Sequence, residues 1–84
     1  MKIEILYFGR PGEQLKITQE AIDLPSSCGT LAALLAWLKL RGELWEQALA
    51  EQRVRCAVNQ EFARFDAPIK AGDEVAIFSP LSGG

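Results

Sequence analysis

The segment TLAALLAWLKLRG, residues 30–42, predicts the one long helix of this chain. Its four core-facing leucines follow one another at i, i+3, i+4 and i+7, which is the spacing of a continuous apolar stripe: Leu31, Leu34, Leu35 and Leu38. Thr30 suits the N-cap position, Gly42 suits the position after the C-terminus, and Trp37 lies off the stripe at the margin of the core. Because a single amphipathic helix covers only one face of a sheet, the remaining segments must supply strands that pack on one side of it.

The residues before this helix predict two strands. Residues 2–8 alternate at the period of a strand, with Ile3, Ile5 and Tyr7 on one face, and residues 21–24 form a short second strand. Gly9-Arg10-Pro11-Gly12 is typical of a turn. Residues 13–20 fit an alternating strand and a helical turn almost equally well.

The residues after the helix predict a short second helix at 43–50 and three further strands at 54–58, 62–65 and 74–79. The short helix offers four side chains to the core: Leu44, Trp45, Ala48 and Leu49. The last strand is apolar, which indicates a central place in the sheet. We therefore expect an α+β protein of the β-grasp (ubiquitin-like) class, a mixed sheet of four to five strands packed on one main helix. In that arrangement the first and last strands are parallel neighbours joined by a right-handed crossover.

Composition limits the function classes. The chain has 84 residues, 49% hydrophobic and 24% charged, with a formal charge of −2, which fits one small globular domain. There is no histidine, and Cys28 and Cys56 are not spaced as a CxxC pair, so neither a catalytic triad nor a metal site is expected. We also expect no nucleic-acid binding, no signal peptide and no membrane segment, and hence a cytoplasmic protein.

The last six residues, Ser79-Pro80-Leu81-Ser82-Gly83-Gly84, predict an extended flexible tail after a domain at residues 1–78. Pro80 cannot donate to a sheet ladder, and two glycines have neither a side chain to pack nor restricted dihedrals. Fully extended, six residues reach roughly 20 Å. Such a tail can present its terminus to a partner's active site, although the same composition also fits an end that merely frays.

A second candidate site follows from strand parity. If Ile3, Ile5 and Tyr7 face the helix, Phe8 faces the uncovered side of the sheet, and Phe78 does so in the last strand. Phe62 is expected to join them near the root of the tail. A contiguous exposed apolar patch usually marks an interface, but each ring could equally fill the margin of the core.

The chain resembles the small subunits of molybdopterin synthase, a family of ubiquitin-like sulfur carriers. The resemblance runs through Ala57-Val58-Asn59-Gln60, Pro68-Ile69, Gly72-Asp73-Glu74-Val75-Ala76-Ile77-Phe78 and the terminal Gly83-Gly84, with supporting matches at Tyr7-Phe8, Asp23-Leu24-Pro25 and Trp45. It departs from the family at Gly9-Arg10-Pro11-Gly12, where the family more often carries a short helix.

The resemblance implies a subunit that is not an enzyme on its own. A partner adenylating enzyme would use ATP to adenylate the Gly84 carboxylate, a persulfide sulfur would replace AMP, and the resulting C-terminal thiocarboxylate (1-thioglycine) would donate sulfur. The acceptor would be cyclic pyranopterin monophosphate in the large subunit, with two small and two large subunits in the complex and no tightly bound cofactor here. Gly83 and Gly84 would carry the chemistry, and the partner-binding residues would be Phe8, Phe62, Phe78, Pro80, Leu81 and Ser82.

Other functions fit the same tail and fold. A sulfur carrier for the thiazole of thiamine and a ubiquitin-like protein modifier would look alike at this level. A plain interaction module with an incidental Gly-Gly end belongs to a different class, and it should keep its activity when Gly84 is deleted.

Overall fold

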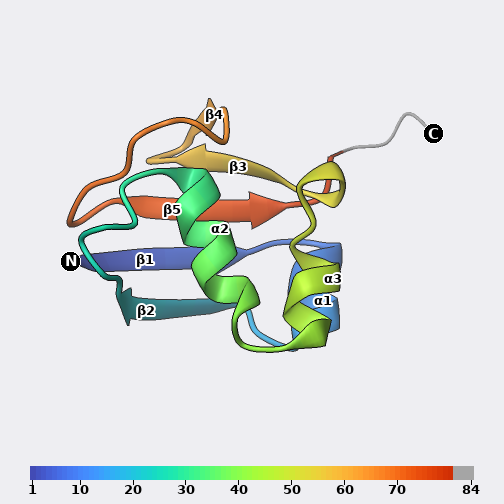
Figure 1. Cartoon of the computed structure of the whole chain (residues 1–84). Helices are drawn as coiled ribbons and strands as arrows, with labels where there is room; N and C mark the ends of the chain where they lie inside the picture. Colours follow the sequence, from blue (N-terminus) through green and yellow to red (C-terminus); the bar gives the residue numbers. More distant parts are fainter. Residues whose placement is uncertain (81–84) are drawn as a thin grey trace.

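The computed structural model describes residues 1–80 of the 84-residue chain and shows a mixed sheet with one helix across it (Figure 1). The sheet has five strands in the order β2-β1-β5-β3-β4. The elements run β1 (Lys2–Tyr7), α1 (Arg10–Leu15), β2 (Gln19–Asp23), α2 (Leu31–Lys39), α3 (Glu43–Ala48), a 3₁₀ turn (Glu51–Arg53), β3 (Arg55–Val58), β4 (Glu61–Ala63) and β5 (Glu74–Phe78).

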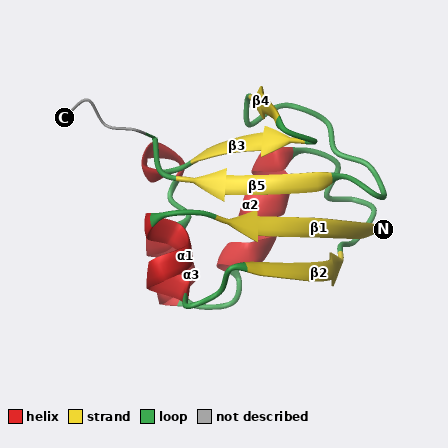
Figure 2. Ribbon diagram, turned by 180° about the vertical axis from the view of Figure 1, so that it is seen from behind, coloured by secondary structure: helices red, strands yellow, loops and turns green. Residues whose placement is uncertain are grey.

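The two terminal strands lie side by side at the centre of the sheet. β1 and β5 are parallel, with Tyr7 opposite Ile77, whereas the β1–β2, β3–β4 and β3–β5 pairs are antiparallel. Figure 2 shows the other face of this sheet, which no helix covers in the described chain, with α1 and α3 grouped at the end where the chain leaves β5. The predicted β-grasp fold is therefore confirmed, including the central position of the last strand.

The core lies between the sheet and α2. The four leucines of the predicted stripe are fully buried, and they pack against the alternate residues of the central strands, namely Ile3, Ile5, Tyr7, Val75 and Ile77. Trp37 is only partly buried and packs at the edge of this cluster, as its place off the stripe predicts. One layer of helix on one layer of sheet thus buries the apolar side of each.

The start of α2 is held from two sides. The Thr30 hydroxyl accepts a hydrogen bond from the Ala33 amide at 3.2 Å, which confirms the predicted N-cap. The amides of Leu31 and Ala32 donate to the carbonyl oxygens of Ala67 and Phe65. The segment between β4 and β5 thereby supplies acceptors for amides that a helix leaves without internal partners.

The segment after β1 corrects a sequence prediction. Residues 10–12, predicted as part of a turn, form the first turn of α1, with Gly9 at its N-cap. Pro11 is accepted in the first helical turn, where its missing amide costs nothing, and it is buried. Gly12 has a packing role, since a Cβ there would lie 3.0 Å from the Tyr7 carbonyl oxygen.

Smaller errors concern element ends and one side chain. Gly42, predicted to end the main helix, lies two residues beyond its C-cap Leu40 and instead precedes α3, at φ 141°. Leu44 does not reach the core but is 51% exposed on α3, whereas Ala48 and Leu49 are buried as predicted. The second strand begins two residues earlier than predicted, β3 begins at Arg55, and the edge strand β4 ends at Ala63.

Candidate partner-binding site at the root of the tail

The uncovered face of the sheet carries an apolar row that crosses four strands. Strand register places Leu6 opposite Ala76, Ala76 opposite Ala57, and Ala57 opposite Phe62. Ala57 is only 8% exposed although it faces away from the helix. The two alanines at the middle of the row have small side chains, so the largest side chain of the row, Phe62, lies at its β4 end.

Phe62 and Phe78 meet at that end. Their ring centroids are 5.7 Å apart at an interplanar angle of 53°, and Phe62 is 86% exposed. Arg55 lies opposite Phe78 in the register of β3 and β5. A phenylalanine this exposed contributes little to folding, which makes the pair available to a partner.

A hollow of about 480 Å³ opens beside these rings, and we call it the tail-root hollow. It is lined by Arg55, Cys56, Phe62, Ala63, Phe78, Ser79 and Pro80. The last two residues are the start of the predicted tail, so the hollow and the tail share one place on the surface.

Phe8, the third predicted aromatic residue, lies directly after β1. Its amide donates to the Ile77 carbonyl oxygen at 2.9 Å, which continues the β1–β5 ladder, and its side chain is 52% exposed. Among residues 1–80, the ring contact between phenylalanines is Phe62–Phe78, and Phe8 takes no part in it. The predicted role of all three in partner binding stays a prediction.

A second hollow, of about 420 Å³, adjoins the other side of the same segment. Its lining consists of Arg10, Arg53, Ser79 and Pro80. Arg10 begins α1 and Arg53 ends the 3₁₀ turn before β3, so two distant segments meet at the chain's exit from β5. These two arginines are not among the site residues predicted from the sequence, because their proximity depends on the packing of α1.

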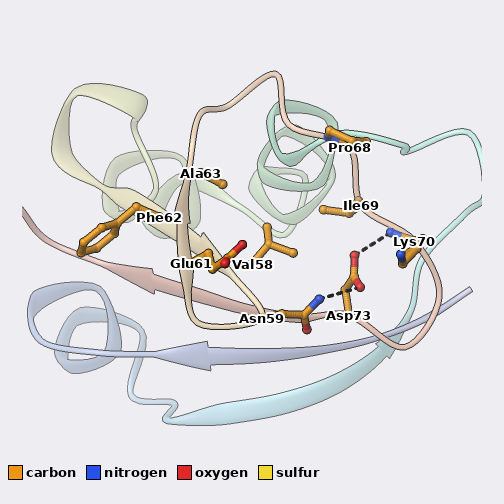
Figure 3. Close-up of a pocket in the computed structure, with 9 residues that line it drawn as sticks. All are labelled: Val58, Asn59, Glu61, Phe62, Ala63, Pro68, Ile69, Lys70 and Asp73. Carbon is orange, nitrogen blue, oxygen red and sulfur yellow. Dashed lines mark hydrogen bonds between the residues drawn. The ribbon is translucent and has the colours of Figure 1, made fainter.

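The opposite end of β3 and β5 is a hydrogen-bonded clasp, drawn in Figure 3 with the residues around it. Asp73 is 5% exposed and its carboxylate accepts from the Asn59 side-chain amide at 3.0 Å and from the Lys70 backbone amide at 2.9 Å. The Asn59 side-chain oxygen accepts in turn from the Glu74 amide. These bonds hold Asn59 and Gln60 in a two-residue turn with positive φ at both positions.

A hollow of about 290 Å³ lies next to this clasp, and its polar groups have a structural role rather than a catalytic one. Both carboxylate oxygens of Asp73 are already bonded to neighbouring turns, so Asp73 has the turn role that the sequence predicts. Phe62 also borders this hollow, but Figure 3 shows its ring pointing away from the clasp.

A polar network closes the covered side of the sheet. Arg41 binds both carboxylate oxygens of Glu20 at 2.8 and 3.0 Å, and the Tyr7 hydroxyl donates to Glu20 at 2.7 Å. The Arg41 guanidinium lies 4.5 Å from the ring centroid of Trp45, which meets Tyr7 edge to face. Burial tends to raise the pKa of Glu20, but hydrogen bonds from Arg41 and Tyr7 outweigh it and lower that pKa. Trp45 therefore belongs to a structural network that ties α3 to β1 and β2.

The cysteines and acidic residues do not form a reactive site in the part of the chain described. Cys56 is buried, and burial raises the pKa of its thiol to about 12, so it is unreactive at neutral pH. Within residues 1–80 no three histidine, cysteine, aspartate or glutamate residues are grouped so as to hold a metal ion. None of the helices described is both long and apolar enough to cross a membrane.

Four predicted site residues, Leu81, Ser82, Gly83 and Gly84, lie outside the described residues. The structure brings three of the other predicted residues together, since Phe62, Phe78 and Pro80 line the tail-root hollow. Phe8 is not among the lining residues, and its backbone amide bonds to Ile77 of β5. These features define a β-grasp protein with an apolar surface beside its C-terminal segment.

Comparison with known proteins identifies the family. The ThiS family model matches residues 5–84, and the chain belongs to this family. It is 36% identical over 84 residues to the molybdopterin synthase sulfur carrier subunit of Escherichia coli, covering 98% of this chain and 99% of the relative. The protein of that name from Haemophilus influenzae is 30% identical over 82 residues, with 98% and 99% covered.

Solved structures agree on the fold. A putative molybdopterin converting factor subunit 1 from Pyrococcus furiosus superposes with a TM-score of 0.76 at 27% identity, over 96% of this chain and 99% of that one. Subunit 1 of the molybdopterin-converting factor from Helicobacter pylori, determined as a complex with subunit 2, gives a TM-score of 0.66 at 24% identity with both chains fully covered.

Proposed function

We propose that this protein is the sulfur-carrier subunit of a molybdopterin synthase and carries the sulfur as a thiocarboxylate on Gly84. One observation carries the proposal: the family match continues through residue 84 and so includes Gly83-Gly84. The curated relatives matched over almost their whole length bear that function in their names. These names also favour molybdopterin over the thiazole of thiamine as the product served.

The chemistry proceeds at the terminal carboxylate. In the adenylating enzyme the Gly84 carboxylate attacks the α-phosphate of ATP, which releases pyrophosphate and forms an acyl adenylate. A persulfide sulfur then attacks the acyl carbon and AMP leaves, after which a thiol cleaves the sulfur–sulfur bond and leaves the thiocarboxylate. A terminal glycine suits both attacks because no side chain obstructs the carbonyl carbon.

Sulfur transfer takes place in the large subunit. There the thiocarboxylate sulfur attacks cyclic pyranopterin monophosphate, and two rounds build the dithiolene. General acids and bases come from the partners, since this chain has no histidine and its buried Cys56 has a raised thiol pKa. The carrier therefore supplies the nucleophile and a docking surface, and two carriers serve a dimer of large subunits.

Docking uses the uncovered face near the tail. The exposed Phe62, the partly buried Phe78 and the tail-root hollow lie where the chain leaves β5, so a partner that takes up the terminus also covers these rings. Aromatic side chains are enriched among residues that dominate binding energy. Phe8, Pro80, Leu81 and Ser82 extend this contact along the sheet and the tail.

Intact-mass spectrometry tests the proposal directly. The purified chain is incubated with its adenylating enzyme, ATP, a persulfide sulfur donor and a thiol reductant. We expect the C-terminal peptide to gain the mass difference of one sulfur replacing one oxygen. The charged carrier, added to the large subunit and cyclic pyranopterin monophosphate, should yield molybdopterin and return to its original mass.

The matched control is the chain lacking Gly84. It keeps the folded domain and its surface, so it should bind the large subunit and yield no molybdopterin. If the full chain remains uncharged under conditions that charge the Escherichia coli carrier, it is not a sulfur carrier. If the truncated chain supports full activity, the plain interaction module is the correct description.

A further inference from the structure

The arginines of this protein differ in whether a carboxylate lies close to them. Within residues 1–80, two of the five arginines of the chain have a carboxylate partner: Arg41 with Glu20 at 2.8 Å, and Arg64 with Asp66 at 3.6 Å. Within residues 1–80, no carboxylate lies within ion-pair distance of the other three, Arg10, Arg53 and Arg55. All three line hollows that include Ser79 and Pro80.

Local folding does not account for this grouping. Arg10 stands at the first position of α1, where the partial positive charge of a helix N-terminus disfavours a cation. Arg53 is exposed at the end of a three-residue 3₁₀ turn. Arg55 donates to the backbone carbonyl oxygens of Glu51 and Val54, which positions its guanidinium without neutralising its charge.

The net charge of the chain makes the grouping more distinct. The protein as a whole is acidic, with eleven acidic and nine basic residues, yet three cations surround the point where the chain leaves the sheet. A basic patch on an acidic protein directs the approach of an acidic surface. We call Arg10, Arg53 and Arg55 the tail-root arginines.

We infer that the tail-root arginines bind carboxylate groups at the rim of the large-subunit channel that receives the tail. This inference rests on the proposed function, and it adds the chemistry of the partner surface that guides insertion. The apolar Phe62–Phe78 pair adjoins the same segment, so the charged contact is continuous with the apolar one.

The length of the tail favours a ligand at the channel mouth over the reacting phosphates. The four residues from 81 to 84 span about 13 Å when extended into a channel. An arginine beside Pro80 then remains at the mouth of the channel, beyond reach of a nucleotide or pterin phosphate at the Gly84 carbonyl. A fixed group of carboxylates on the partner's rim is within reach at that depth.

The test compares two variants with the same net charge. Arg10→Gln/Arg53→Gln removes two tail-root arginines, and Lys2→Gln/Lys70→Gln removes two exposed lysines at the opposite end of the sheet. Arg55 is left unchanged because it also contacts the apolar hollow. Stopped-flow association with the large subunit is measured at low and high salt for the wild type and both variants.

We expect the arginine variant to associate about ten-fold more slowly at low salt, with a dissociation rate within about two-fold of the wild type. The difference should shrink at high salt, because screening removes the steering that the variant lacks. The lysine variant should match the wild type within about two-fold.

Equal association rates of the two variants with the large subunit would overturn the inference. Thiocarboxylate formation on the wild-type chain is measured in parallel. If the wild type is charged and transfers sulfur while the arginine variant associates normally, only the arginine inference fails. If the wild type is never charged, the proposed function fails.

Discussion

The two faces of the sheet are built from the same strands but have different roles. On the covered face, β1 and β5 contribute Ile3, Ile5, Val75 and Ile77, all buried under α2. On the uncovered face the same strands contribute Leu6, Ala76 and Phe78, and the Phe78 ring contacts the 86% exposed Phe62. Alternation of side chains lets one strand stabilise the domain and present a surface at once.

This difference predicts which mutations should affect stability and which should affect partner binding. A residue on the covered face is surrounded by the core, so its loss leaves a cavity. A residue on the uncovered face borders solvent, so its loss removes a contact only when a partner is present.

The largest expected effect is on the covered face. Leu35→Ala removes a fully buried side chain at the centre of α2 and should lower the free energy of unfolding by about 2–5 kcal/mol. Urea denaturation followed by circular dichroism measures it. Leu44→Ala, which truncates a half-exposed leucine on α3, is the matched control and should change stability by less than about 0.5 kcal/mol. Equal effects from the two leucines would contradict the assignment of the core.

The next effect belongs to the uncovered face. Phe78→Ala and Phe62→Ala should each weaken binding to the large subunit by about 1–3 kcal/mol, because each removes an aromatic ring from the proposed interface. Phe62→Ala should leave the unfolding free energy within about 0.5 kcal/mol of the wild type. Isothermal titration calorimetry gives the affinities, with Leu44→Ala again as control. Unchanged affinity in both phenylalanine variants would show that the uncovered face is not the docking surface.

The smallest expected effect is on the free energy of unfolding, and it depends on pH. It concerns Glu20, which belongs to the polar network on the covered side of the sheet. The pKa of Glu20 is lowered in the folded protein, so its ionised form stabilises the fold above the ordinary carboxylate pKa. That contribution is lost as the pH falls through the lowered pKa. Glu20→Gln should therefore cost about 1 kcal/mol near pH 7 and less near pH 3, below the ordinary carboxylate pKa.

Urea midpoints at both pH values measure this difference. Glu46→Gln, on the exposed side of α3, is the control and should have no comparable pH dependence. A loss of the same size at both pH values would show that charge on Glu20 does not stabilise the network with Arg41 and Tyr7.

Much of the fold could be predicted because its signals are local and periodic. The leucine spacing of α2, the alternation in β1 and the cap at Thr30 each depend on neighbours within one or two turns of chain. The prediction of a turn at residues 9–12 was wrong because it also relied on local signals alone. Two glycines and a proline favour a turn locally, but burial of Pro11 and the close approach of Gly12 to the Tyr7 carbonyl favour a helix in the folded chain.

The candidate site was predictable only in part. Strand parity was sufficient to place Phe8 and Phe78 near the exit from β5, since side-chain direction follows from position in a strand. It could not bring Arg10 and Arg53 together, because they come from α1 and a 3₁₀ turn whose packing no periodic pattern records. Nor could it reveal that Asn59 and Asp73 hold two turns together through their side chains.

The class of fold, the central place of the last strand and the Gly83-Gly84 pair follow from the sequence alone, because they depend on hydrophobic periodicity and on residue identity. The residues that surround Ser79 and Pro80 are known only from the folded structure. Strand register sets the Phe62–Phe78 pair, and the packing of α1 brings Arg10 to Arg53 beside Pro80. Contacts between segments distant in the chain arise from packing, and packing is what local patterns do not specify.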